Sequence, residues 1–421
     1  MNSPTAEWDV IVIGAGAAGL LAATRAAELG RRTLLVEKNA RPGVKILMSG
    51  GTRCNLTHNT DARGIVAAYG RPGKFLHSAL AALGPREVVE LVEAEGVRTK
   101  IEETGKIFPV SDRAADVLEA LLARLRRSGA QLRLGCPVTE LVRTPAGFEL
   151  ATPSGLLATP RVILTTGGQS YPGSGTTGDG YRFATALGHT IEPLHPALTP
   201  ITTDAAWVRE LTGLTIPDVG LEVVPTEALA SRDRKAVLAA ARGSLLFAHF
   251  GLSGPVALDV SRAISGAANP RLLSLRCDFL PGIAAADLER LLLPEGGGGR
   301  PVHSVLTAHL PRRLAEALLA VAGLPSDRRL AEVGKADRAR WLEAIKRCPI
   351  AVSGTKGYGK AEVTAGGVSL AEVDSRTLQS KLVPGLYLAG EVLDLDGPIG
   401  GYNFQAAFST GWLAGASAAA T

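Results

Sequence analysis

The chain opens with the stretch DVIVIGAGAAG at residues 9–19. Its first half, 9–13, is an apolar run that predicts a buried strand, and it leads directly into a GxGxxG turn. The following residues, 20–29, predict a helix that stops at Gly30, and a second apolar strand closes on Glu37. Strand, glycine turn, helix, strand and carboxylate in this order are typical of a dinucleotide-binding βαβ unit.

Each residue type in this unit has a physical role. Gly14 permits the tight turn, Gly16 lets the backbone approach a pyrophosphate, and Gly19 lets the helix pack closely on the strand. The helix start offers unpaired N–H groups and a positive dipole end to phosphates, and Glu37 is placed to accept hydrogen bonds from a ribose. We therefore expect the adenosine diphosphate half of a dinucleotide to contact Gly14, Gly16, Ala17, Ala18, Gly19, Glu37 and Lys38.

The bulk composition excludes several classes of protein. The 421 residues carry a net charge of +5, but the basic residues are scattered, so we expect no nucleic-acid partner. The four cysteines form no C-x-x-C pair, which argues against a zinc ribbon and fits a reducing, cytoplasmic compartment. The first eight residues lack the features of a secretory signal, and no apolar run is long enough to span a membrane. No metal-ligand cluster is visible, so we predict no metal.

The pattern along the chain predicts an α/β domain built from both ends with an insert between them. Residues 1–193 predict alternating strands and helices, and residues 352–421 again show glycine turns, a buried strand and a helix. Three prolines between 193 and 200 mark the change. We expect the insert at 194–351 to be β-rich over 194–280 and helical over 281–351, and to act as a substrate or cap domain.

A second strong signal lies near the C-terminus. The buried strand predicted at 385–391 ends in Gly390 and Glu391, and a carboxylate there can hold a polyol such as the ribityl chain of FAD. Shortly afterwards, paired glycines open the last helix, and such a helix start stabilises the anionic edge of a reduced flavin. We therefore predict FAD as the cofactor, with the ring contacted by Gly400, Gly401, Tyr402, Asn403 and Phe404.

Other candidate cofactor residues lie between these two signals. The stretch from Gly50 to Asn55 reads as a flavin cradle, with Lys45 and Arg53 as donors and Cys54 as a small buried thiol beside the ring or, alternatively, a redox group. Val138 is expected to begin a strand, and its backbone N–H and C=O are expected to form hydrogen bonds with the edge of the adenine ring. The candidate set from this part of the chain is Lys45, Gly50, Gly51, Arg53, Cys54, Val138, Gly167, Gly168 and Asp179.

A literal second GxGxxG occupies residues 173–178. It does not emerge from a strand, so we interpret it as a loop that closes over FAD, with Asp179 capping the next helix. A separate NAD(P) site is the alternative. For catalysis, Arg53 and His249 are the candidates for substrate polarisation and protonation, although a structural role for this lone histidine is the competing interpretation.

Five blocks together resemble one bacterial flavoprotein family: 9–19, 45–57 (KILMSGGTRCNLT), 105–112 (GKIFPVSD), 248–255 (AHFGLSGP) and 363–401. The family is that of the BaiN-like, or aminoacetone-oxidase-family, FAD-binding enzymes. Its pattern usually has a third glycine where this chain has Thr52, and often an asparagine where it has His58. The resemblance implies a two-dinucleotide-binding-type FAD domain with an inserted β-barrel-like and helical region. At least one member is described as reducing an enone in a bile-acid intermediate with NADH.

The prediction is an FAD-dependent oxidoreductase that moves a hydride between a small organic substrate and the flavin, with NADH or NADPH as a transient donor. Two alternatives stay open, namely a flavin-dependent RNA-modifying enzyme and a non-catalytic flavin-binding redox sensor. The sequence leaves the substrate and the choice between a monomer and a homo-oligomer undetermined.

Overall fold

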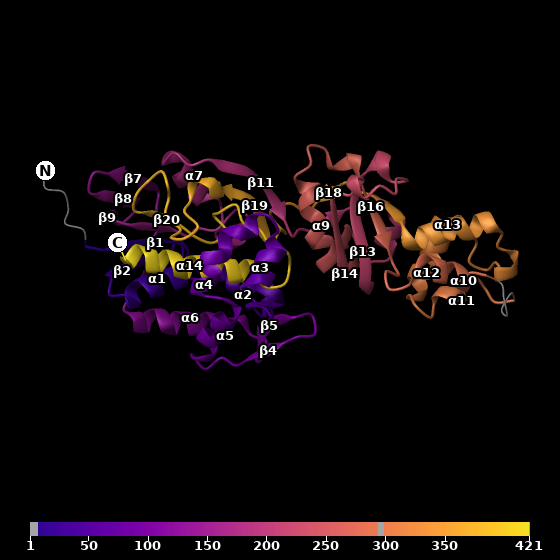
Figure 1. Ribbon diagram of the computed structural model, residues 1–421, viewed down its shortest axis with the longest axis horizontal. Coiled ribbons are helices and arrows are strands. Elements are labelled where there is room, and N and C mark those ends of the chain that lie inside the picture. Colours follow the sequence, from indigo (N-terminus) through magenta and orange to yellow (C-terminus); the bar gives the residue numbers. More distant parts are fainter. Residues whose placement is uncertain (1–6, 294–298, 421) are drawn as a thin grey trace. The chain divides into compact units, whose positions relative to one another are not determined.

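The computed structural model describes residues 7–293 and 299–420, so most of the N-terminal segment used above to argue against a secretory signal lies outside it. The chain divides into two compact units, Met1–Pro196 with Glu362–Thr421, and Ala197–Ala361 (Figure 1). Each unit has its own cluster of buried apolar side chains.

The first unit is built on a five-stranded parallel sheet in the order β20-β10-β1-β2-β6. Its central strands are fully buried and almost wholly apolar, as expected of a sheet covered on both faces. The strands of this unit are β1 (Val10–Ile13), β2 (Thr33–Val36), β3 (Thr57–His58), β4 (Thr99–Ile101), β5 (Lys106–Pro109), β6 (Gln131–Arg133), β7 (Glu140–Thr144), β8 (Gly147–Thr152), β9 (Gly155–Thr159), β10 (Val162–Leu164), β11 (Ile191–Ala197, ending at the unit boundary), β19 (Val363–Val368) and β20 (Leu386–Leu388).

Smaller sheets complete the first unit: β3-β5-β4 and β7-β8-β9 are antiparallel, and β11 pairs with β19. Its helices are α1 (Ala17–Glu28), α2 (Val44–Thr52), α3 (Ala62–Tyr69), α4 (His77–Ala82), α5 (Pro85–Glu93), α6 (Ala114–Ser128), α7 (Asp179–Ala186) and α14 (Tyr402–Ala420). The predicted helix at 20–29 is α1, which ends as expected before Gly30, a residue with φ of 86°.

The C-terminal helix α14 runs alongside α1 (Figure 1). The two helices approach so closely that a Cβ on Gly411 would lie 2.2 Å from the Ala18 carbonyl oxygen, and one on Gly415 would lie 2.3 Å from that of Ala22. The small residues of the last helix therefore have a packing reason, since only glycine fits against the backbone of α1 at these two positions.

The second unit contains a seven-stranded antiparallel sheet in the order β17-β16-β13-β14-β15-β12-β18. Its strands are β12 (Ile201–Thr202), β13 (Thr215–Pro225), β14 (Ala239–Ala248), β15 (Gly251–Ser253), β16 (Leu273–Asp278), β17 (Cys348–Ala351) and β18 (Gly354–Thr355). Its helices are α8 (Ala206–Glu210), α9 (Pro255–Ser265), α10 (Ala285–Leu291), α11 (His303–Leu306), α12 (Arg312–Val321) and α13 (Lys335–Lys346). β18 lies beyond the predicted end of the insert at 351 and pairs with β12.

The fold class predicted from the sequence, a Rossmann-like α/β domain combined with a β-rich and helical insertion, is confirmed. Some element ends differ. The strand expected to begin at Val138 begins at Glu140, and the strand expected to run to Glu391 ends at Leu388. In addition, the glycine-rich cradle after Gly43 contains a short kinked helix, α2.

Candidate functional site

The register of the parallel sheet gathers the predicted cofactor residues at one edge. Ile13 is paired with Val36 on one side and with Leu164 on the other, and Leu164 is paired with Leu388. The residues that follow these four strand ends therefore emerge together at the carboxyl edge of the sheet. The chain leaves β1 toward β2 on one side, while β10 lies on the other, so this edge is a topological switch point, where open α/β sheets bind ligands.

The three glycines of the first motif have different surroundings. A Cβ on Gly14 would lie 2.7 Å from the Thr165 carbonyl oxygen, and one on Gly19 would lie 1.8 Å from the Gly14 carbonyl oxygen. Gly16, in contrast, has open space where a Cβ would be, with nothing within 4 Å. Helix α1 begins beside that space with no side-chain cap and no acidic residue in its first turn. This opening at an uncapped helix start is suited to a pyrophosphate.

Glu37 directly follows β2 and is buried, with 8% of its surface exposed. Its carboxylate accepts hydrogen bonds from the Ala15 N–H at 2.8 Å and the Asn39 N–H at 2.9 Å. These two bonds fix the carboxylate next to the glycine turn and use only part of its acceptor capacity. The remaining lone pairs are available to the hydroxyls of a ribose.

The second glycine motif is not a dinucleotide fingerprint. A 3-10 turn, η2 (Pro172–Ser174), leads into it where a strand would be required. The expectation that Asp179 caps the next helix is wrong, because Asp179 is itself the first residue of α7 and Gly178 holds the cap position. The Asp179 carboxylate instead accepts from Lys38 Nζ at 2.6 Å, which ties this loop to the end of β2.

Glu391 lies at the centre of a polar network at the same edge of the sheet. One carboxylate oxygen accepts from the Ser170 hydroxyl at 2.8 Å and the Thr364 N–H at 3.0 Å, and the other pairs with Lys45. Lys45 Nζ also donates to Ser170 Oγ at 3.0 Å. Gly168 is required beside this network, since a Cβ there would lie 2.9 Å from the Glu391 carboxylate. Ser170 and Thr364 are not among the predicted site residues, because nothing in their sequence spacing connects them with Glu391.

The segment after α2 has an unusual backbone. Gly50, Gly51 and Thr52 follow one another at φ of 55°, 67° and 69°, and Cys54 is at 61°. For a β-branched residue such as Thr52 this is an outlier, and it falls where the related family usually has glycine. Cys54 is completely buried, and burial raises the pKa of its thiol to about 12. A protonated, inaccessible thiol fits the interpretation of a packed side chain rather than a redox group.

Asn55 joins this segment to the start of α14. With its amide oriented to satisfy its neighbours, the oxygen accepts from the Gly401 N–H at 3.0 Å and the nitrogen donates to the Thr57 carbonyl at 3.0 Å. A Cβ on Gly401 would lie 2.6 Å from that same Thr57 carbonyl group. The structure therefore brings two predicted flavin-contacting segments, 50–55 and 400–404, into direct contact.

The turn before α14 is held by side chains. Asn403 accepts from the Gly397 N–H at 2.8 Å and donates to the Gly397 carbonyl at 2.9 Å. The Tyr402 ring stacks on His58 with ring centres 4.8 Å apart, and His58 Nδ1 lies 3.1 Å from the Gly400 carbonyl oxygen. Phe404 packs instead toward Phe408, at 5.8 Å between ring centres. The side chains of Tyr402 and Asn403 thus shape the turn, which leaves its backbone as the part suited to a ring edge.

Arg53, a candidate for substrate polarisation, is held by acidic partners. Its guanidinium lies 2.6 Å from the Glu102 carboxylate and 3.3 Å from that of Asp112, and it stacks on the Phe108 ring at 4.0 Å. The bond to Glu102 raises the pKa of Arg53 further. These contacts favour a structural role, in which Arg53 fastens the 50–55 segment to the β4–β5 hairpin.

The remaining candidates are Val138 and His249. Val138 stands just before β7, in coil. His249 belongs to the second unit, at the turn between β14 and β15, where its exposed ring lies edge-on to Phe250 with centres 5.0 Å apart. Within residues 7–293 and 299–420, no group of three or more histidine, cysteine or acidic side chains is arranged to hold a metal. None of the helices in that part of the chain is long and apolar enough to cross a membrane.

The comparison with protein families decides the relationship, because the HI0933-like protein Rossmann domain matches residues 8–417. The chain belongs to this family. It is 33% identical over 418 residues to an Escherichia coli (strain K12) protein named ribosomal RNA dihydrouridine synthase, covering 96% of each chain. It is 32% identical over 414 residues to a 3-dehydro-bile acid delta(4,6)-reductase of Clostridium scindens, covering 97% of this chain and 98% of the relative.

Among solved structures, a 3-ketosteroid-Δ4-(5α)-dehydrogenase from Rhodococcus jostii RHA1 has a TM-score of 0.50 at 15% identity, over 99% of this chain and 98% of that one. At this identity the likeness concerns the fold. The resemblance stated from the sequence motifs is confirmed, and with it the prediction of an oxidoreductase of a flavoprotein family.

Proposed function

We propose that this protein uses FAD to reduce a carbon–carbon double bond conjugated to a carbonyl group, with a nicotinamide dinucleotide as electron donor. The observation that carries the cofactor assignment is the opening at Gly16, which has free space beside an uncapped helix start while Gly14 and Gly19 are tightly packed. The names of two relatives support the reaction type, since a dihydrouridine and a delta(4,6)-reductase product both arise by loss of a ring double bond.

The residues present fit FAD from end to end. In this proposal the N–H groups of Gly16, Ala17 and Ala18 hold the pyrophosphate, Glu37 holds the adenosine ribose, and Glu391 holds the ribityl chain. The Lys45 ammonium pairs with the Glu391 carboxylate and holds it in place, and a carboxylate is a strong acceptor for hydroxyl groups. The other cofactor residues predicted from the sequence are proposed on their sequence motifs alone, with Arg53 acting by holding the 50–55 segment in place.

At the other end of the cofactor, the start of α14 directs the positive end of the helix dipole toward the site. This favours negative charge at the neighbouring ring edge. Bound FAD would supply a ring that accepts a hydride from one partner and releases it to another. In the overall reaction, one carbon of the double bond receives the hydride from the donor, and the adjacent carbon receives a proton.

In this proposal the first unit is the cofactor domain and the second unit contributes to substrate recognition, with His249 kept as a candidate proton donor. A small carbonyl-conjugated alkene is the first candidate substrate, in line with the bile-acid reductase relative. The proposed compartment is the cytoplasm, on the cysteine usage noted above.

A second candidate substrate is a uridine in RNA. One observation besides the E. coli relative favours it. Residues 197–361 contain twenty-one basic and sixteen acidic residues, whereas the rest of the chain contains twenty-four of each. The entire net charge of +5 therefore belongs to the second unit, and a net positive charge favours contact with the phosphates of RNA.

The test is to pre-reduce the FAD-loaded protein without oxygen and to mix it with candidate acceptors. Reoxidation by a cyclic enone, together with recovery of the saturated ketone, supports the first substrate. Reoxidation by ribosomal RNA, together with dihydrouridine in the digested RNA, supports the second. If no conjugated acceptor reoxidises the flavin, the proposal of double-bond reduction is contradicted, and the redox-sensor alternative is favoured instead.

A further inference from the structure

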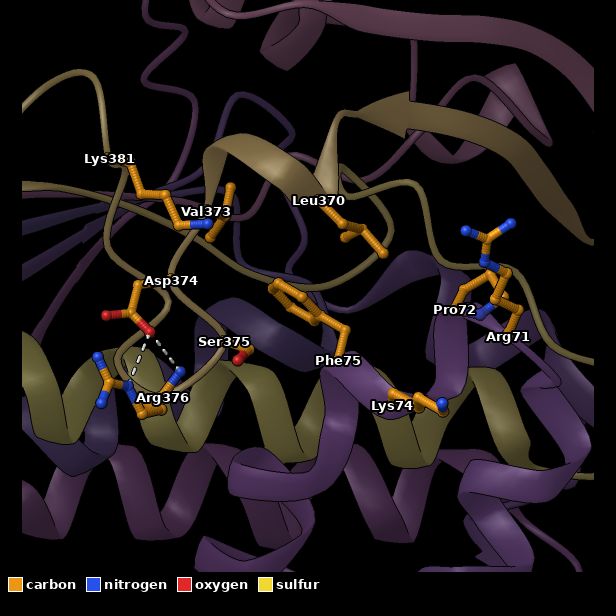
Figure 2. Close-up of a pocket in the computed structure, with 10 residues that line it drawn as sticks. All are labelled: Arg71, Pro72, Lys74, Phe75, Leu370, Val373, Asp374, Ser375, Arg376 and Lys381. Atoms are coloured by element: carbon orange, nitrogen blue, oxygen red, sulfur yellow. Dashed lines mark hydrogen bonds and ion pairs between the residues drawn. The ribbon is translucent and has the colours of Figure 1, made fainter.

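The first unit contains a cavity of about 640 Å³ that none of the assignments above uses. One side comes from residues 71–75, mostly in η1 (Pro72–Leu76), and the other from residues 370–381, which follow β19. Figure 2 shows the two groups of side chains facing each other across the cavity. Its volume falls within the range of ligand and cofactor sites. We call it the basic pocket.

The charges around the basic pocket are unbalanced. Arg71, Lys74, Arg376 and Lys381 line it with only one carboxylate, that of Asp374. Asp374 is already engaged by Arg376, whose backbone N–H donates to it at 2.9 Å (Figure 2). The lining therefore carries an excess of positive charge, which calls for an anionic ligand.

Two of these cations have no partner of their own. Within the described chain, the side chains of Arg71 and Lys74 make no hydrogen bond or ion pair, and both residues are exposed. Lys381, in contrast, donates to the Ala371 carbonyl at 2.8 Å. Arg71 and Lys74 are thus the groups available to a phosphate, for which the fork of arginine and the point charge of lysine are well suited.

The pocket also offers an aromatic surface. The half-buried Phe75 ring lies between the two groups of lining residues in Figure 2, near Leu370 and Val373. A planar ring in the same wall as two free cations suits a ligand that combines a flat base with phosphate groups, because bases stack on aromatic side chains. A nucleotide has both features.

Both walls of the basic pocket are tied to the proposed flavin site. Tyr69, two residues before Arg71, donates its hydroxyl to the Tyr402 carbonyl at 3.0 Å. On the other wall Val368, two residues before Leu370, donates its N–H to the Val392 carbonyl at 2.9 Å. A ligand in the pocket therefore lies against segments that are bonded directly to the start of α14 and to the residue after Glu391.

We infer that the basic pocket binds a nucleotide, with its base against Phe75 and its phosphates on Arg71 and Lys74, and that the occupant is the phosphate-bearing half of the nicotinamide donor. This inference rests on the proposed function. It supplies the donor site that the loop at 173–178 does not provide. The excess of positive charge further favours NADPH, with its additional phosphate, over NADH.

The test measures binding rather than turnover. NADP+, which does not reduce flavin, is titrated by calorimetry into the FAD-loaded protein and into the double variant Arg71→Ala/Lys74→Ala. We expect at least a tenfold weaker Kd for the double variant, with an unchanged flavin spectrum. Phe75→Leu should weaken binding with the charges intact. Arg86→Ala, which removes an exposed arginine of α5, is the matched control and should bind as the wild type does.

An unchanged Kd in the double variant overturns the inference, as does a wild-type protein that binds neither NADP+ nor NAD+. The same titration is carried out with a short oligoribonucleotide. If the double variant loses its affinity for RNA and retains that for NADP+, the pocket is an RNA-phosphate site and the dinucleotide assignment is wrong. Failure of the proposed function gives a different pattern, namely normal NADP+ binding in the wild type with no conjugated acceptor that reoxidises the flavin.

Discussion

Replacing Gly16 with alanine separates cofactor binding from folding more cleanly than any other change in the glycine motif. Gly16 has φ of −83° and ψ of −169°, an extended conformation open to any residue, and a Cβ there meets nothing within 4 Å. Alanine is a poorer helix N-cap than glycine by up to about 1 kcal/mol, but it also reduces the entropy of the unfolded chain by about 0.4–1 kcal/mol. The two effects nearly cancel, so the flavin-free variant should retain its stability within about 1 kcal/mol.

The same methyl group occupies the space through which a pyrophosphate would reach the start of α1. We expect the Kd for FAD to rise at least tenfold, which corresponds to about 1.4 kcal/mol. Urea unfolding of the flavin-free protein measures the stability, and quenching of flavin fluorescence on reconstitution measures the affinity.

Gly19→Ala is the contrasting variant. Its Cβ would lie 1.8 Å from the Gly14 carbonyl oxygen, so it should lose about 1–3 kcal/mol of folding stability and lose FAD with it. If Gly16→Ala binds FAD as tightly as the wild type, the assignment of this opening to the pyrophosphate is refuted.

Three further predictions follow from the packing and the ionisable groups. Glu391→Gln keeps the shape but not the charge, so FAD affinity measured by reconstitution should fall about tenfold, and equal affinity would contradict the ribityl assignment. Gly411→Ala forces a methyl group against the backbone of α1, so urea unfolding should show a loss of about 1–3 kcal/mol, whereas Gly173→Ala, with nothing within 4 Å, should show little change. Burial raises the pKa of Cys54 and Cys348 to about 12, above the ordinary value of 9.0. The unfolded chain therefore loses these thiol protons first, and the free energy of unfolding should fall as pH rises from 9 toward 12, while constant stability across that range would show that the thiols are not buried.

The parts of the site predicted from the sequence are those that depend on local backbone chemistry. Glycines at fixed spacing after an apolar run identify a strand, turn and helix because only a few backbone conformations satisfy that pattern. Glu37 could be assigned in the same way, since it directly follows a buried strand. The start of the last helix was recognisable for the same reason, because paired glycines directly precede α14, which begins at Tyr402.

The remaining contacts depend on the tertiary fold. Ser170 donates its hydroxyl and Thr364 its backbone N–H to Glu391. No spacing rule connects a serine on a loop, or a residue of β19, with this carboxylate. Asn55 also could not be predicted from the sequence, because its role is to join two glycine-containing segments by a hydrogen bond to Gly401. Asp179 illustrates a local error, because an acidic residue at a helix start suits both the cap and the first turn, and Lys38 holds it in the first turn.

The measurement that tests the central claim most directly is an anaerobic visible spectrum of the purified protein, recorded before and after addition of NADPH or NADH. The account predicts flavin absorption bands at about 370 and 450 nm that bleach on addition of the donor and return with a conjugated acceptor. A protein that neither retains nor can be reconstituted with flavin would contradict it.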